Sequence, residues 1–300
     1  DDGVPNSVAE LRTLVAAVQA RLDGMAGSEA EFEASRLQKE RIQVGSMLAD
    51  GLEKDLAAFA MGPAAQRMEK AATMTSEEPL RTLLAERAGD LRSAERALAA
   101  LVQGWSAPGW RRQSVLDPRK GASGSIEIIG IENGVLRVSD SGVTEDMPFS
   151  SWSGHTAELE NLFLGRLNRD YTAEECRGVA TLLGISATLE TLRALEPALG
   201  TTGLRVSSDD SDEITAPFRE ALDWAENAES DLGDELRTLL GERTLMEIIK
   251  EQERAARMLT EALIARDQGR WDASAERLER LLEERREAWL VMMLSKGGAQ

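Results

Sequence analysis

Histidine and cysteine, the usual side chains for a catalytic base, a thiol nucleophile and a soft metal ligand, are almost absent from this sequence. Its 300 residues include a single histidine, His155, and a single cysteine, Cys176. A catalytic triad needs a base for the proton of the nucleophile, and a structural zinc site needs about four Cys or His ligands. His155 lies between Gly and Thr in a pattern typical of a helix start, and Cys176 lies on the apolar side of an expected helix. We therefore expect no metal ion, no cofactor and no catalytic residue of either type.

Carboxylates are the abundant reactive group. The chain has 53 Asp and Glu residues against 35 Lys and Arg residues, and its formal net charge is −18. Paired carboxylates can act as general acid and base, as in glycoside hydrolases, so counting alone leaves a carboxylate-dependent hydrolase open. The usual role of so many acids is a solvated helix surface. Because this charge repels phosphate backbones, we expect no nucleic-acid partner.

Two ligand-binding motifs that use glycine or clustered acids are missing. No Gly-x-Gly-x-x-Gly or Gly-x-x-x-x-Gly-Lys-Ser/Thr string occurs, and the glycines of residues 121–124 precede an expected strand instead of a helix. Residues 209–213 hold four acids but lack the mid-loop glycine and the closing glutamate of a calcium loop. They are predicted to be a solvated linker.

Large aromatic side chains and arginines gather where the helical patterns break. Trp105 and Trp110 flank a proline, and aromatics in such segments either fill a seam between subdomains or mark a binding surface. The seam is the favoured interpretation.

The apolar run of residues 288–294 exceeds what one buried helix face needs, so we expect it to dock on another chain, including a second copy, or on the body of this chain. The candidate interaction residues are Trp105, Trp110, Arg111, Arg112 and Trp289.

Residues 111–120 form a basic island in this acidic chain. They include Arg119 and Lys120 as well as the two preceding arginines, against Asp117 alone. Three interpretations are open: an external anionic partner, an internal contact with the acidic residues 209–213, or a solvated loop whose exposed ion pairs contribute little. The neighbouring tryptophans favour the internal contact over the external partner.

Helices are predicted throughout the first third of the chain. Leu, Val and Phe recur at three- and four-residue steps over residues 8–22, 28–62 and 76–103, with Gly or Pro near the ends. A further short helix is predicted over residues 63–74. Helices joined by short loops usually lie antiparallel. Residues 1–104 are therefore predicted to form a helical bundle.

A three-stranded antiparallel β meander is predicted next. Residues 125–131, 135–139 and 143–149 are separated by Glu-Asn-Gly and Asp-Ser-Gly sequences, and Asn-Gly between apolar runs is a strong signal for a hairpin with a type I′ turn. Val143, Met147 and Phe149 alternate with polar residues, so this side of the last strand is predicted to be buried. Three strands need helices or a partner to pack against.

Helices resume after the meander. A capping box of Thr172 and Glu175 is predicted to open one helix, Gly184 to end it, and Ser186 to cap the next. Residues 105–200 are therefore predicted to be one unit, in which the meander packs on helical hairpins.

Residues 201–300 are predicted to be acidic helical hairpins. The sequence Gly269-Arg270-Trp271-Asp272, followed by Leu278, Leu281 and Leu282, resembles the turn and second helix of a tetratricopeptide hairpin. The resemblance covers about one unit and departs at Ser274, where that family has a small alanine. The place of Trp271 after Gly269 predicts that its side chain is buried between the last two helices.

The layout of the chain suggests a bacterial context. A glycine-rich meander followed by helical hairpins is similar to accessory regions attached to large bacterial serine/threonine kinases of planctomycete type. No kinase motif is present, so the resemblance implies no kinase activity. The sequence opens without Met and has no apolar stretch that could span a bilayer. We expect an extracytoplasmic protein, with its signal or anchor removed, in preference to a cytoplasmic one.

The sequence thus predicts a mainly α fold, a helical bundle and helical hairpins around a small β meander. The expected function is a non-catalytic protein-interaction, sensor or scaffold module, because helical hairpins and an acidic surface accompany a lack of catalytic groups. The alternative is a carboxylate-dependent hydrolase with its site between the meander and the adjoining helices. A pocket holding two mutually perturbed carboxylates would favour this enzyme.

Overall fold

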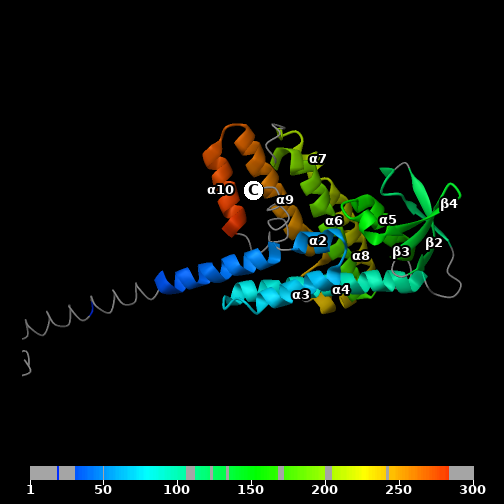
Figure 1. Ribbon diagram of the computed structural model, residues 1–300, viewed down its shortest axis with the longest axis horizontal. Coiled ribbons are helices and arrows are strands. Elements are labelled where there is room, and N and C mark those ends of the chain that lie inside the picture. The colour runs from blue at the N-terminus through cyan, green and yellow to red at the C-terminus, as the bar shows by residue number, and fades with distance from the viewer. Residues whose placement is uncertain are drawn as a thin grey trace, which may run out of the picture.

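Long helices make up most of the chain, and one small antiparallel sheet covers an end of the molecule (Figure 1). This arrangement confirms the predicted mainly α fold class. The computed structural model describes residue 19 and residues 31–49, 51–105, 112–121, 124–132, 135–167, 172–199, 205–240 and 243–283. Of the helix predicted over residues 8–22, only residue 19 is described, and it is helical.

The N-terminal helices are divided by a glycine. Residues 31–49 are helical, and α2 (Leu52–Ala57) follows after Gly51, whose φ of 98° is a left-handed conformation that favours glycine. The single helix predicted over residues 28–62 is therefore interrupted. Next come α3 (Met61–Ala72) and α4 (Glu78–Trp105), which pack against each other.

The helix α6 (Ala173–Leu199) is largely buried. It packs on α4, α5 (Thr156–Leu167), α8 (Pro217–Leu240) and α9 (Leu245–Asp267). Its start is the predicted capping box: the Thr172 N–H donates to Glu175 (2.7 Å) and the Glu175 N–H donates to Thr172 Oγ1 (3.3 Å). The prediction that Gly184 ends this helix was wrong, because α6 continues through it. An internal glycine costs only about 1 kcal/mol, which burial on all sides of α6 outweighs.

The sheet has four strands instead of the predicted three. The additional strand is β1 (Gln113–Leu116), and it precedes β2 (Ser125–Glu132), β3 (Val135–Asp140) and β4 (Val143–Pro148). The strands pair antiparallel in the order β1-β2-β3-β4. Four residues give too short a pattern to be recognised as a strand. The Leu116 N–H, on this edge strand, donates to the Asn161 side chain of α5 (2.9 Å).

One face of the sheet packs on the helices. A register shift between Ile128 and Gly130 re-phases β2, so that Ile131 also packs against the core. The prediction that Val143 is buried was wrong: its side chain is 68% exposed, and of β4 only Met147 is buried. Val143 begins the edge strand, beyond the reach of the helices. The buried sheet residues are Val115, Ile126, Ile128, Leu136, Val138 and Met147.

The hairpin between β3 and β4 forms at the predicted place in the chain. Ser141 and Gly142 have φ values of 52° and 88°, the positive pair that a type I′ turn requires. The Asn133 and Gly134 turn lies outside the described residues, although the strands on either side of it pair from Glu132 and Val135 onward.

A short 3₁₀ helix, η2 (Phe149–Trp152), leads from the sheet to α5 (Thr156–Leu167). The Ser186 hydroxyl, predicted to cap a helix of its own, lies inside α6 and accepts hydrogen bonds from the Gly154 and His155 N–H groups (both 3.1 Å). Glu190 accepts another from the Thr156 N–H (3.0 Å). Side chains of α6 thus satisfy the first backbone donors of α5.

Four helices complete the chain: α7 (Ser211–Ile214), α8 (Pro217–Leu240), α9 (Leu245–Asp267) and α10 (Trp271–Glu283). The helix α9 begins with a second capping box, formed by Thr244 and Glu247. It packs against α6 on one side and pairs with α10 on the other.

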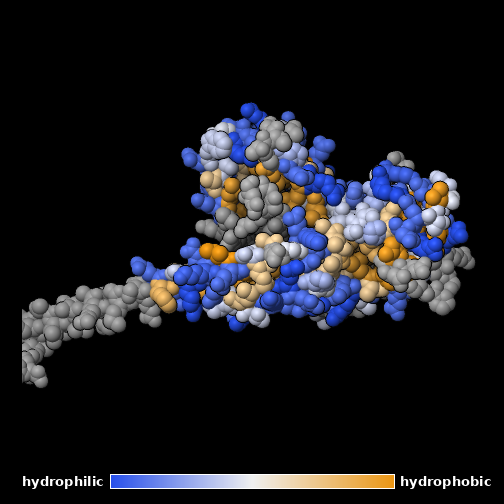
Figure 2. Space-filling model, viewed as in Figure 1, coloured by the Kyte–Doolittle hydropathy of each residue, from blue (hydrophilic) through white to orange (hydrophobic). Residues whose placement is uncertain are grey.

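The hydrophobic core is continuous across the three predicted segments. A large cluster of buried residues includes members of α4, the sheet, α6, α8 and α9, and a smaller cluster joins the end of α6 to α9 and α10. The division into units of residues 1–104, 105–200 and 201–300 stays a prediction. Figure 2 shows one face of the molecule, on which hydrophobic residues are visible where the α9–α10 hairpin meets the body and again toward the sheet.

Candidate functional site

The predicted interaction residues have different surroundings. Trp105 is only 5% exposed; its indole stacks on Phe149 with ring centroids 5.9 Å apart, and its Nε1 donates to Gln113 (3.4 Å). It therefore fills the seam between α4 and the sheet, as the favoured interpretation predicted. Arg112 lies on the sheet surface and pairs with Glu127 at 3.4 Å. Trp110, Arg111 and Trp289 lie outside the described residues.

The basic island pairs with the sheet. Arg119 donates to Asp117 (2.9 Å) and pairs with Glu145 of β4 (2.7 Å), while Lys120 donates to Asp140 at the end of β3 (2.5 Å). The hydrogen bonds from Arg119 lower the pKa of the Asp117 carboxyl. For the described basic residues, the predicted contact with residues 209–213 was wrong, because the meander brings closer acids beside them.

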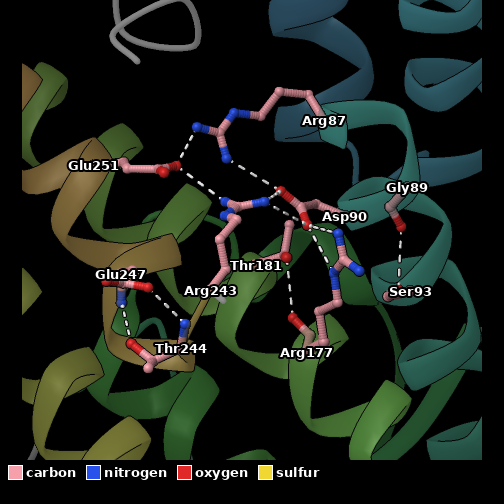
Figure 3. Close-up of polar contacts among 10 residues, drawn as sticks. All are labelled: Arg87, Gly89, Asp90, Ser93, Arg177, Thr181, Arg243, Thr244, Glu247 and Glu251. Atoms are coloured by element: carbon pink, nitrogen blue, oxygen red, sulfur yellow. Dashed lines mark hydrogen bonds and ion pairs between the residues drawn. The ribbon is translucent and has the colours of Figure 1, made fainter. Parts of the chain in front are cut away.

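Three arginines converge on one buried carboxylate between α4, α6 and α9 (Figure 3). Asp90 of α4 is 2% exposed and accepts from Arg87 (3.1 Å), from Arg177 of α6 (2.6 Å) and from Arg243 (3.2 Å), which precedes α9. Glu251 of α9 completes the group, accepting from Arg243 (3.0 Å) and from Arg87. We call these five residues the Asp90 cluster.

The Asp90 cluster joins helices that are far apart in sequence. Burial opposes the charge of Arg243, but Asp90 and Glu251 outweigh that effect and raise the pKa of its guanidinium. Each acceptor oxygen is shared by cations from different segments, so the cluster specifies how α4, α6 and α9 fit together. We assign it a structural role.

A second group of charges is entirely acidic and lies where α5, α6 and α8 meet. Desolvation, with Glu220 and Asp223 nearby, raises the pKa of Glu160. Desolvation, with Glu190, Glu158 and Asp223 nearby, likewise raises the pKa of Glu220. We call these five carboxylates the acidic junction. In it, Glu220 of α8 raises the pKa of Glu160 of α5, and the pKa of Glu220 is itself raised by other members. Carboxyls with raised pKa values are a feature that the hydrolase alternative needs.

Replacing Glu160 and Glu220 together by glutamine is expected to stabilise the protein at pH 7, by up to about 1 kcal/mol. Both carboxyls have a folded-state pKa above the ordinary value of 4.5, so ionisation penalises the folded state. This loss of stability is complete when the pH lies above the pKa of both carboxyls in the folded state. It disappears as the pH falls below about 4.5, the ordinary pKa, because both carboxyls are then protonated in the folded and unfolded states. The gain in melting temperature at pH 7 should therefore vanish near pH 4.

A suitable control for that comparison is Asp231→Asn, which removes an exposed charge of α8 outside the acidic junction. It should change the melting temperature little at either pH. An unchanged or lower melting temperature of the double variant at pH 7 would contradict the assigned repulsion.

The α9–α10 hairpin presents an apolar row to solvent. The prediction that Trp271 is buried was wrong: it is 66% exposed, and Leu278, two helical turns later, is 39% exposed. Ser274 and Leu281 instead face α9; the Ser274 hydroxyl donates to the Ala262 carbonyl (2.8 Å). The reason is the orientation of α10 about its own axis. The side of α10 that carries Ser274 and Leu281 packs on α9, and Trp271 lies about 60° around the helix from that side.

Trp271→Ala is accordingly expected to lower the free energy of unfolding by less than about 1 kcal/mol. If Trp271 were buried, the same substitution would lower the free energy of unfolding by about 3 to 5 kcal/mol. Urea denaturation measures the difference, with Leu281→Ala on the buried side of the same helix as the destabilised reference. A midpoint for Trp271→Ala as low as that of the reference would show that Trp271 is packed.

The remaining candidates for chemistry have structural surroundings. Cys176 is buried in α6 at 1% exposure, as predicted, and His155 lies at the start of α5. Within the described residues, no three His, Cys, Asp or Glu side chains are grouped so as to hold a metal ion. None of the described helices has the length and hydropathy needed for a membrane span.

Comparison with known proteins gives no relative. No protein-family model matches the chain, and no curated protein and no solved structure is significantly similar to it. The function must therefore be inferred from the geometry of the chain.

Proposed function

We propose that this chain is a non-catalytic protein-interaction module that binds a partner protein through the exposed side of α10. The observation that carries the proposal is the apolar row of Trp271 and Leu278, 66% and 39% exposed on one side of one helix. Exposed apolar surface can mark an interaction site, and tryptophan is among the residues enriched in binding hot spots. We call Trp271, Ala275 and Leu278 the α10 row.

The architecture around the α10 row supports this proposal. Leu281 packs with Leu263 and Leu195 in the smaller core cluster, so α10 is anchored to α9 and through it to α6. A row held on such a platform loses little conformational entropy when a partner binds. The same arrangement fits a scaffold.

Site-specific photocrosslinking in cells tests the proposal. A photoreactive amino acid at Ala275, which is exposed between Trp271 and Leu278, should yield discrete crosslinked products. The products should disappear when Trp271→Ala and Leu278→Ala are added. The matched control places the same amino acid at Asp234 of α8, whose side chain is 99% exposed. Identical products from both positions, or products that persist in the double variant, would contradict docking at the α10 row.

The hydrolase alternative has one observation in its favour. Glu160 and Glu220 have raised pKa values, and a general acid works best when its pKa approaches the working pH. The helix α5 that carries Glu160 also packs on β1 of the sheet. Chromogenic glycosides test this candidate: turnover that Glu160→Gln and Glu220→Gln abolish would support the enzyme, whereas no turnover is expected of an interaction module.

A further inference from the structure

A row of acids lies directly beside the α10 row. Asp272, Glu276 and Glu279 each follow a member of the α10 row by one residue, so they lie about 100° further around the helix. All three residues are exposed. The apolar and acidic rows therefore run parallel along α10 and face solvent together.

The acidic row is only partly neutralised by the chain itself. Glu276 pairs with Arg280 at 3.1 Å, and Arg277 is directed to Glu261 of α9 at 3.5 Å. No ion pair within the described residues involves Asp272 or Glu279. The row thus retains negative charge that a partner can meet.

The opposite side of the α10 row is closed. Ser274 and Leu281 are 6% and 4% exposed because they pack on α9. A partner that covers Trp271 and Leu278 must therefore approach over the open side of α10, where the acids lie. Its contact surface has to combine apolar and positively charged side chains.

We infer that the occupant of α10 is a basic amphipathic helix of a partner protein, which covers the α10 row with its apolar side and pairs Lys or Arg with Asp272 and Glu279. Helices of this kind bind to apolar surfaces through anchors spaced three, four and seven residues apart. Ion pairs at the edge of such a contact orient the bound helix and raise its association rate. The inference rests on the proposed function, since it names the class of partner for the same face.

A second copy of this chain fits the face less well. In a two-fold antiparallel pair of α10 helices, equivalent edges meet, so the acidic row would lie against its own copy. The net charge of −18 adds repulsion between copies. The observed charge distribution thus favours a basic partner.

Fluorescence anisotropy with the full chain tests this inference. The probe is a labelled Leu/Lys amphipathic peptide of about 18 residues, long enough to form a helix, and its counterpart has Glu in place of Lys. We expect the Lys peptide to bind and the Glu peptide not to bind. Trp271→Ala with Leu278→Ala should weaken binding of the Lys peptide at least about tenfold.

A charge-matched pair of variants separates local recognition from general acidity. Asp272→Lys with Glu279→Lys should weaken binding at least about tenfold, whereas Asp231→Lys with Asp234→Lys on α8 makes the same change in net charge and should have less than about twofold effect. All four residues are exposed, so circular dichroism should show intact folding. Equal weakening by both pairs would overturn the inference, as would equal binding of the two peptides.

Further outcomes distinguish the inference from the proposed function. A dimer in analytical ultracentrifugation that Trp271→Ala and Leu278→Ala dissociate would assign the face to a second copy and overturn the inference, while docking at α10 would stand. A rise in peptide affinity on Trp289→Asp would assign the face to the chain's own residues 284–300, again overturning the inference. If peptide binding, self-association and the crosslinks are all independent of Trp271 and Leu278, the proposed function itself fails.

Discussion

A Gly178→Val variant is expected to lose about 3 kcal/mol or more of the free energy of unfolding. Gly178 is buried on α6 where that helix crosses α4, and a Cβ atom there would lie 2.1 Å from the Ser93 carbonyl oxygen. The obstacle is backbone, which cannot rotate away as a flexible side chain does. The helices would have to separate, and this separation would also lengthen the contacts of the Asp90 cluster.

Urea denaturation followed by circular dichroism measures this loss. Gly89→Ala is the matched control, because it adds a Cβ to α4 whose closest neighbour is Arg177 Nη2 at an ordinary 3.7 Å. That change should leave stability equal or raise it by up to about 1 kcal/mol through helix propensity. If the valine variant does not fold, Gly178→Ala supplies the comparison. Equal stability of Gly178→Ala and Gly89→Ala would disprove the close contact.

Removal of the Asp90 carboxylate is expected to cost about 3 to 5 kcal/mol. Asp90→Ala leaves Arg87, Arg177 and Arg243 close together without the acceptor that they share. The remaining carboxylate of the cluster, Glu251, cannot neutralise three cations. The loss should depend weakly on salt, because buried pairs are screened much less than exposed ones.

The comparison for Asp90→Ala is Glu69→Ala, which breaks the exposed pair of Glu69 on α3 with Arg92 on α4 (3.1 Å). That variant should lose less than about 1 kcal/mol, and its loss should shrink as ionic strength rises. If Asp90→Ala does not fold, Glu251→Gln is the substitute variant. It removes the charge of the other, more exposed carboxylate of the cluster and should cause a smaller loss of stability. Similar small losses for Asp90→Ala and Glu69→Ala would show that the cluster contributes no more than a surface pair.

Local signals in the sequence predicted the elements that depend on neighbouring residues alone. The capping box of Thr172 and Glu175 forms as expected, because its atoms are three residues apart. The hairpin around Ser141 and Gly142 forms where the sequence places a short connection between two strands, with positive φ at both residues. Cys176 is buried because it continues the apolar side of its own helix.

The sequence did not predict the features that depend on contacts between distant segments of the chain. The sequence around Gly184 carries a stop signal, and only burial between α4, α8 and α9 makes α6 continuous. The Asp90 cluster joins residues 87 to 251, and no pattern of spacing indicates which arginines share a carboxylate. A separation of that size is visible only in the folded chain.

The sequence by itself therefore determined the mainly helical fold, the three strands of the meander and the capping box of Thr172 and Glu175, because local periodicity and turn chemistry control them. The tertiary structure alone decided that Trp271 faces water and Trp105 does not. Both lie on amphipathic helices, and helical periodicity defines a side without saying what covers it. The sheet covers Trp105, whereas α9 covers only the Ser274 and Leu281 side of α10, which leaves Trp271 and Leu278 exposed.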